Sequence, residues 1–166
     1  FRALQELNED ELTMAGIKIG NKAPAFKLPS TAGEWSLGAQ SGAVVLYFYP
    51  KDNTPGCTDE GKQFAALHKD FKKAGAVIAG ISADSVKAHE NFKAKFGFPF
   101  ELLSDPDRKV CTLYDVIQEK SMYGKKYMGI ERSTFLIDAK GVLRAEWRKV
   151  KVKDHAQAVL EALKSL

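Results

Sequence analysis

The sequence predicts an α/β fold in which helices cover both faces of a mixed β-sheet. Strand-like and helix-like segments alternate along most of the chain. The segment Ala43–Tyr49 is apolar at every position, as expected of a central strand with both faces covered. The triplet Ala139–Gly141 lies between two apolar segments, which is typical of a hairpin, so the sheet is expected to contain antiparallel strands as well.

Local patterns define each element in order. Pro50 ends the first strand, and a helix is expected from Thr58 to Gly75 because apolar residues recur there at spacings of three and four. A strand at Ala76–Ser82 follows. The next helix is expected to be capped by Asp84 or Ser85 and broken by Gly97 and Pro99. The remaining elements are a strand at Glu101–Leu103, a helix from Asp105-Pro106, strands at Thr134–Asp138 and Val142–Trp147, and a helix at His155–Leu163.

The composition limits the classes of protein that this chain can belong to. Its 166 residues suit one domain, and a formal net charge of +4 is too mild for a dedicated nucleic-acid binder. Two cysteines exclude a disulfide framework and a four-cysteine zinc site. The longest apolar run is too short to span a bilayer, and no signal-peptide pattern opens the chain. A cytoplasmic location is therefore expected.

Residues 1–14 differ in character from the rest, because acidic residues dominate their charge. They are expected to be an extension outside a single domain of residues 15–166. Their apolar residues also fit a short amphipathic helix, and Met14 also fits a natural start. The origin of this segment therefore stays open.

The segment from Pro50 to Cys57 carries the strongest indication of chemistry. It places Cys57 after a buried strand and a tight turn, on the first turn of a helix. Backbone N–H groups there lack partners within the helix, and the helix dipole is positive at that end. Both effects favour a thiolate, the reactive form of cysteine. The hydroxyl of Thr54 can donate to a substrate oxygen or to the sulfur, or it can cap the helix.

This segment resembles a known family. Pro50, Thr54 and Cys57 match the Pro-x-x-x-Thr-x-x-Cys signature of peroxiredoxins, and Thr54–Thr58 is similar to the bacterioferritin-comigratory, or PrxQ-type, subgroup. Further blocks resemble the family in order and spacing: Gly20–Pro29, Leu103–Asp105 and Gly129–Asp138. The resemblance covers nearly all of residues 16–166 and implies a thioredoxin-like fold.

The resemblance also implies a reaction. Arg132 aligns with the arginine that faces the reactive thiolate in the family, and Pro50 supports the approach loop. Glu60 stands where the family often has Glu or Gln, so it is expected either to orient Arg132 or to compensate the helix dipole. Cys57 is then expected to attack the O–O bond of hydrogen peroxide or an organic hydroperoxide and to become a sulfenic acid. The implied reaction requires no cofactor and no metal.

The chain departs from many PrxQ-type proteins in its cysteines. Two positions where such proteins carry a resolving cysteine hold Lys62 and Lys93 here. The chain therefore resembles a one-cysteine variant that is recycled by an external thiol, either thioredoxin, glutaredoxin or glutathione. Cys111 is the one internal candidate for a resolving cysteine, but its apolar helix pattern favours packing. A monomer without nucleic-acid or membrane contacts is expected.

Rival functions match only parts of the pattern. A thioredoxin-like disulfide exchanger would need Cys-x-x-Cys, and Glu60 stands at the second cysteine position. A binding module would use the basic stretch Arg148–Lys153, which is otherwise expected to be an exposed edge strand protected by lysines. A Cys-His hydrolase is disfavoured, because the three histidines, His68, His89 and His155, lie in no persuasive context and are expected at the surface.

Overall fold

The computed structural model describes residues 17–166, so the segment expected to be an extension lies outside the described residues. The strands are β1 (Lys27–Ser30), β2 (Gly33–Ser36), β3 (Ala43–Phe48), β4 (Ala76–Ser82), β5 (Glu101–Ser104), β6 (Ile117–Met122), β7 (Lys125–Ile130), β8 (Ser133–Ile137) and β9 (Leu143–Trp147). The helices are α2 (Pro55–Ala66), α3 (His68–Lys73), α4 (Val86–Phe96), α5 (Lys109–Leu113) and α6 (His155–Lys164), with a short 3-10 helix η2 (Leu37–Ala39). Within this part of the chain, no helix is long and apolar enough to cross a bilayer.

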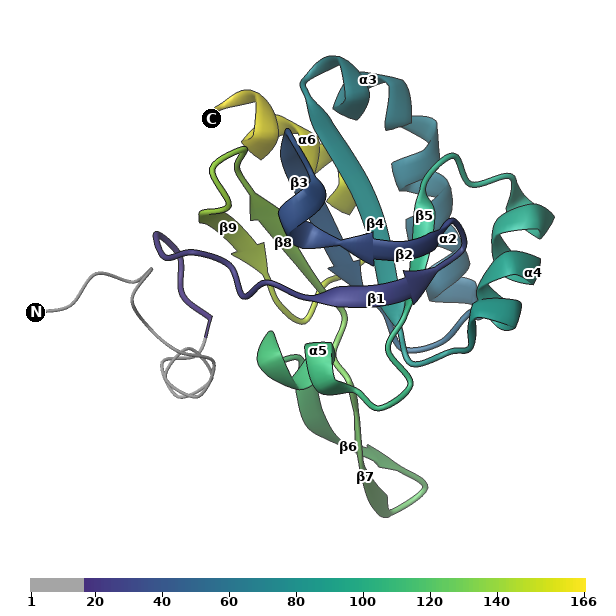
Figure 1. Ribbon diagram of the computed structural model, residues 1–166. Helices are drawn as coiled ribbons and strands as arrows, with labels where there is room; N and C mark the ends of the chain where they lie inside the picture. Colours follow the sequence, from purple (N-terminus) through teal and green to yellow (C-terminus); the bar gives the residue numbers. More distant parts are fainter. Residues whose placement is uncertain (1–16) are drawn as a thin grey trace, which may run out of the picture.

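Seven strands form one mixed sheet in the order β2-β1-β5-β4-β3-β8-β9 (Figure 1). The three central strands β3, β4 and β5 are parallel. Antiparallel strands flank them, β1 and β2 on one side and β8 and β9 on the other. The predicted α/β class and mixed sheet are therefore confirmed, and β8 and β9 form the predicted hairpin.

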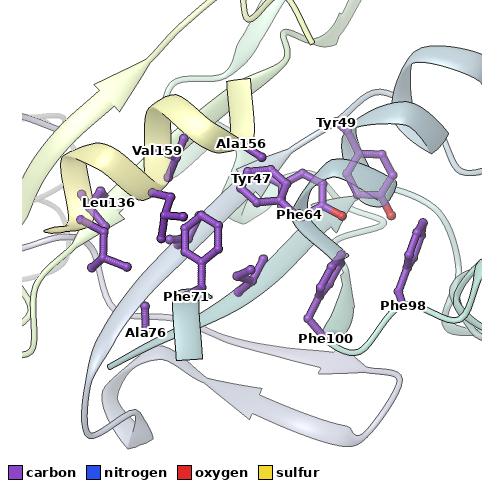
Figure 2. Close-up of a cluster of buried hydrophobic side chains, with 14 of the residues drawn as sticks. Tyr47, Tyr49, Phe64, Phe71, Ala76, Phe98, Phe100, Leu136, Ala156 and Val159 are labelled. Atoms are coloured by element: carbon purple, nitrogen blue, oxygen red, sulfur yellow. The ribbon is translucent and has the colours of Figure 1, made fainter. Parts of the chain in front are cut away.

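The central strand β3 separates two apolar cores. Val45 and Tyr47 face a core shared with α2, α3, α4 and α6, part of which is shown in Figure 2. Val44 and Leu46 face a second core, to which α5 contributes. Neighbouring side chains of a strand point to opposite faces, so an uninterrupted apolar strand requires cover on both sides. The predicted helical cover of both faces is confirmed.

The sequence pattern predicts both ends of α4 correctly. The hydroxyl of Ser85 accepts a hydrogen bond from the backbone N–H of Ala88 at 3.1 Å, so Ser85 is the N-cap. Gly97 ends the helix in the left-handed conformation, with φ of +67°.

The expectation of one continuous helix from Thr58 to Gly75 is wrong. The chain forms α2 and α3, which meet at Leu67, where φ is −100° and ψ is 5°. The change of direction keeps both Phe64 and Phe71 fully buried. The apolar spacing thus predicts the buried face but not the break.

The helix expected to start at Asp105-Pro106 also differs, because α5 begins only at Lys109. Asp105 Oδ2 accepts a hydrogen bond from the backbone N–H of Cys111 at 2.8 Å. Arg108, just before the helix, has a left-handed φ of 56°. The aspartate therefore stabilises the helix start from a turn that is itself not helical.

The hairpin of β6 and β7 is absent from the sequence-based expectations. Its strands form a separate two-stranded sheet that projects from the body of the molecule (Figure 1). The turn uses Tyr123 and Gly124, with φ of +52° and +79°, as in the tight turns that match strand twist. β6 contains Lys and Met among mostly polar residues, and β7 contains Lys, Tyr and Met, so no clean alternation of polar and apolar residues marks these strands.

The expectation of an edge strand at Arg148–Lys153 is wrong, because β9 ends at Trp147. The guanidinium of Arg148 turns back to donate to two backbone carbonyls that follow α5, and it lies over an aromatic ring of the second core. Lys149 then takes a left-handed φ of +49°. These interactions end the extended conformation.

Two of the three histidines expected at the surface are buried instead. His89 is 0% exposed and His155 is 6% exposed. His89 Nε2 lies 2.9 Å from the carbonyl of Leu103, and His155 Nε2 lies 2.8 Å from Oγ1 of Thr134. A histidine whose ring nitrogens have hydrogen-bond partners is tolerated in a core, so the expectation of a surface position is wrong for these two residues.

Candidate active site

The loop after β3 brings Cys57 to the first turn of α2. Pro50 follows the strand at the surface, Asn53 has a left-handed φ of +60°, and Thr54 occupies the N-cap position before Pro55. Cys57 is the third residue of the helix, and its side chain is 1% exposed. The cysteine therefore lies at a helix N-terminus, where the sequence pattern predicts it.

Arg132 bridges Cys57 and Glu60. Its Nη2 donates to Sγ of Cys57 at 3.3 Å, and its Nη1 donates to Oε1 of Glu60 at 2.7 Å. A Cβ added to Gly56 would lie 3.1 Å from Nη2, so the glycine lets the guanidinium pack closely against α2. The three residues that the resemblance groups together are therefore in direct contact.

Two opposing effects act on the guanidinium of Arg132. Burial lowers the pKa of Arg132, but Glu60 and Cys57 raise it by more, so the pKa lies above its ordinary value. Arg132 therefore remains charged beside the sulfur. A positive charge held at hydrogen-bond distance attracts an anionic sulfur and offers a directed donor to an incoming oxygen atom.

Glu60 is a buried carboxyl whose two oxygens have different surroundings. Oε1 accepts from Arg132, whereas Oε2 has no hydrogen-bond partner among residues 17–166 and lies 4.0 Å from His155 Nε2. Burial raises the pKa of Glu60 to about 7, against the attraction of Arg132. The charge of the Glu60–Arg132 pair therefore changes near neutral pH.

His155 lies behind Glu60, and no sequence pattern predicted it at the site. Burial, and then the charge of Arg132, lower the pKa of His155 to about 4, so its ring is neutral at physiological pH. Nε2 shares a hydrogen bond with Thr134 of β8. The contact joins α6 to β8, and no local sequence pattern reports such a long-range pairing.

The hydroxyl of Thr54 does not have the capping role considered for it. It donates to the carbonyl of Lys51 at 2.8 Å, and no backbone N–H of the described α2 bonds its side chain. Its backbone nevertheless has the extended conformation of an N-cap residue, with φ of −93° and ψ of 155°. The hydroxyl oxygen keeps its capacity to accept a hydrogen bond.

Cys111 lies on the other side of the sheet from Cys57. Its side chain belongs to the second core, whereas that of Cys57 belongs to the first. Burial raises the pKa of Cys111 strongly, and the carboxylate of Asp105 raises it further. A disulfide between the two cysteines would require one of them to cross the sheet, so the geometry favours the packing role.

Lys120 of β6 is a second residue near the site that the sequence analysis missed. Its Nζ donates to the backbone carbonyl of Ile130, two residues before Arg132. Burial lowers the pKa of Lys120 and Arg132 lowers it further, whereas Glu131 and Cys57 act in the opposite direction. The ammonium group of Lys120 is therefore close enough to interact electrostatically with both Cys57 and Arg132.

A further polar network anchors the loop that precedes Cys57. Tyr49 donates to Asp52 Oδ1 at 2.5 Å, and Asp52 Oδ2 lies 2.6 Å from His89 Nδ1. Asp84 Oδ2 accepts from the backbone N–H of Asp52 at 2.8 Å. Asp52, Asp84 and His89 are the one group of metal-ligand type among the described residues, with ligand atoms within 4.8 Å of one another. Because hydrogen bonds to the protein already engage these side chains, we assign them to holding the loop.

The chain is similar to known proteins over most of its length. A model described as the AhpC/TSA family matches residues 19–146. A putative peroxiredoxin bcp of Coxiella burnetii is 54% identical over 149 residues, which cover 89% of this chain and 99% of that protein. The solved structure of Xanthomonas campestris Peroxiredoxin Q has a TM-score of 0.81 and 55% identity, covering 84% of this chain and 90% of the other.

A second solved structure concerns the alkyl peroxide reduction activity of the Xanthomonas campestris bacterioferritin comigratory protein. It has a TM-score of 0.81 and 54% identity, and it covers 84% of this chain and 90% of that chain. The thioredoxin-like peroxiredoxin fold that the resemblance implies is confirmed by these neighbours.

Proposed function

The chain belongs to the AhpC/TSA family as a peroxiredoxin, and we propose that its Cys57 is the thiol that reduces hydrogen peroxide and organic hydroperoxides. The observation that carries this proposal is the 3.3 Å contact from Arg132 Nη2 to Cys57 Sγ at the N-terminus of α2. The alkyl peroxide reduction described for the Xanthomonas protein supports the organic substrates.

In the proposed reaction, the thiolate of Cys57 attacks one oxygen of the peroxide. An S–O bond forms while the O–O bond breaks, and the leaving oxygen takes up a proton to give water or an alcohol. Cys57 is oxidised to a sulfenic acid as the peroxide is reduced. Because Arg132 already directs a donor at the sulfur, it is placed to stabilise the charge that moves onto the peroxide oxygens. The free N–H groups of the first turn of α2 act in the same sense.

Two further residues support this reaction in our proposal. Glu60 holds the guanidinium of Arg132 from behind, through the 2.7 Å contact to Nη1. Thr54 orients the peroxide, because its hydroxyl hydrogen is bound to Lys51 and its oxygen can accept the hydrogen of a hydroperoxide. Pro50 restricts the backbone at the start of the loop.

We also propose that an external thiol restores Cys57. Lys62 and Lys93 occupy the positions where many PrxQ-type proteins carry a resolving cysteine, and Cys111 lies in the opposite core. The sulfenic acid then condenses with a thiol, which releases water and leaves a mixed disulfide, and a second thiol reduces that disulfide. Thioredoxin, glutaredoxin and glutathione are the candidate reductants. The enzyme acts in this scheme as a monomer in a reducing compartment such as the cytosol.

Peroxide turnover with dithiothreitol tests the proposal. Wild type should consume hydrogen peroxide and an organic hydroperoxide such as cumene hydroperoxide, and Cys57→Ser should consume neither. Full activity in the folded Cys57→Ser variant would contradict the proposed role of the cysteine. The rival binding module predicts no rapid peroxide consumption by wild type.

A further inference from the structure

The tip of the β6–β7 hairpin concentrates exposed apolar side chains. Of the seven large apolar side chains that are exposed among residues 17–166, four lie between residues 122 and 128. They are Met122 (57% exposed), Tyr123 (99%), Tyr127 (44%) and Met128 (53%). Such a concentration on a folded domain marks an interaction surface, and methionine and tyrosine are residue types that interfaces favour.

The register of the hairpin places Met122, Lys125 and Tyr127 on one face, with Tyr123 in the turn. Met128 lies on the other face. The antiparallel ladder of the hairpin extends without interruption from the pair Ile117–Ile130 to the pair Met122–Lys125. Only the base of the hairpin enters the second core, through Ile117 and Ile130, whereas the tip projects away from the main sheet (Figure 1). The apolar tip is therefore displayed outward rather than folded against the domain.

The charge of the hairpin selects the kind of partner. Lys120, Lys125 and Lys126 lie on its strands, against a single acidic residue, Glu119. Glu119 forms an ion pair with Lys126 at 3.4 Å, so Lys125 is an exposed cation beside the apolar side chains. A partner with an apolar patch and acidic residues around it would complement this surface.

The position of the hairpin connects this surface to the chemistry. β7 leads into Arg132 two residues after its last residue, Ile130. At roughly 3.4 Å per residue, Lys125 at the tip lies at most about 24 Å from Arg132 along the chain. A small domain about 30 Å across can therefore touch the tip and Cys57 at once, whereas a small thiol cannot. Cys57 is 1% exposed, so a reductant has to be aligned closely to reach it.

We propose that the tip surface formed by Met122, Tyr123, Lys125 and Tyr127 docks the protein that re-reduces Cys57, a small acidic dithiol protein of the thioredoxin class. This inference rests on the proposed function. One thiol of the partner displaces water from the Cys57 sulfenic acid to form a mixed disulfide. The second thiol of the partner then attacks that bond, which returns Cys57 as a thiol and leaves the partner oxidised to a disulfide.

A double variant, Tyr123→Ala with Lys125→Glu, tests this proposal against two reductants. The protein reductant is a bacterial thioredoxin of negative net charge, kept reduced by its reductase, and the small reductant is dithiothreitol. The variant should raise the KM for thioredoxin about tenfold or more and leave dithiothreitol-driven turnover unchanged, since loss of an anchoring aromatic and reversal of a charge weaken docking only. Sedimentation should show a monomer in both proteins.

A matched control makes the same kinds of change far from the hairpin. Leu166 is 48% exposed at the C-terminus, which lies at the end of the molecule opposite to the hairpin (Figure 1), and Lys140 is an exposed cation. The double variant Leu166→Ala with Lys140→Glu should leave both activities unchanged.

Four outcomes would overturn the docking proposal. They are an unchanged KM for thioredoxin in the hairpin variant, an equal effect of the control variant, an equal loss of dithiothreitol-driven turnover, and a wild type that uses dithiothreitol but not thioredoxin. A wild-type dimer that the hairpin variant dissociates would instead assign the surface to a second copy of this chain. Failure of the proposed function is distinct, because wild type would then show no turnover with either reductant.

Discussion

Cys57 and Cys111 occupy equivalent local positions but opposite electrostatic surroundings. Each is the third residue of a helix, α2 and α5 respectively, and each is almost fully buried, with 1% and 0% exposure. Cys57 accepts a hydrogen bond from the cation Arg132, whereas Cys111 lies beside the carboxylate of Asp105. The two sulfurs face opposite cores of the same sheet.

A helix N-terminus therefore does not by itself fix the electrostatic surroundings of a cysteine. Both cysteines lie in the first turn of a helix, where the dipole is positive, although the backbone N–H of Cys111 is already bonded to Asp105. What separates the sites is the sign of the nearest charge, since a cation favours the thiolate and a carboxylate disfavours it.

Exchange of each sulfur for oxygen should give the largest contrast. Cys57→Ser should abolish peroxide turnover, because a hydroxyl does not ionise at neutral pH. Cys111→Ser should keep most of the wild-type activity with dithiothreitol, because Cys111 packs in the opposite core. Steady-state peroxide consumption measures both. If a folded Cys111→Ser variant were inactive, Cys111 would have to take part in the cycle.

Removal of the cation should come next. Arg132→Met keeps much of the apolar stem but removes the donors to Cys57 and Glu60. Loss of one preorganised donor of this kind slows a reaction by about 10²–10³-fold, and we expect a decrease in that range for peroxide reduction. Stopped-flow measurement of sulfenic acid formation isolates this step from recycling. A rate within about threefold of wild type, well under 1 kcal/mol in activation free energy, would remove Arg132 from the mechanism.

Glu60→Gln should change the pH dependence of stability. The pKa of Glu60 rises from 4.5 to about 7 on folding, mainly through burial. Between these values the folded chain holds a proton that the unfolded chain has released, so the free energy of unfolding falls as the pH rises. This contribution to the free energy of unfolding is fully present below pH 4.5 and is lost above about pH 7. The total change across this window is about 3 kcal/mol.

Urea unfolding at the two ends of this pH window measures that change. Wild type should lose about 3 kcal/mol more than Glu60→Gln, because the amide accepts from Arg132 without titrating. The control for general effects of pH is the variant itself. Equal losses in the two proteins would mean that Glu60 is ionised throughout the window.

Asp105→Asn should have the smallest effect and is best measured in the Cys57→Ser background, where Cys111 is the remaining thiol. The amide oxygen can still accept from the N–H of Cys111, but the negative charge is gone. Alkylation of Cys111 by iodoacetamide in the folded state should accelerate by less than about tenfold, because burial is the larger cause of its raised pKa. An acceleration far above this range would make charge, rather than burial, the main protection.

The sequence predicts those features of the site that depend on neighbouring residues. The strand, the turn and the helix start that present Cys57 are all encoded between Ala43 and Cys57. The buried central strand, the cap at Ser85 and the hairpin of β8 and β9 are local in the same sense. Arg132, in contrast, was expected near Cys57 only through the family resemblance, since no local rule joins positions so far apart in the chain.

The missed features depend on tertiary contacts. His155 reaches the site because α6 packs against α2 and β8, and its polar partner Thr134 makes its burial tolerable. Lys120 approaches Cys57 only through the β6–β7 register, and mixed polar and apolar residues conceal that hairpin in the sequence. The break at Leu67 preserves the apolar spacing that predicted one helix, so periodicity could not reveal it.

The intact mass of the protein after one equivalent of hydrogen peroxide, with dimedone present and with no reductant, tests most directly whether Cys57 is the peroxide-reactive thiol. We expect a single dimedone adduct that peptide mapping assigns to Cys57, with Cys111 unmodified. A loss of two hydrogens together with a linked Cys57–Cys111 peptide would contradict it, because the two sulfurs would then have to meet across the sheet. An unmodified protein would contradict the assignment of Cys57 as the peroxide-reactive thiol.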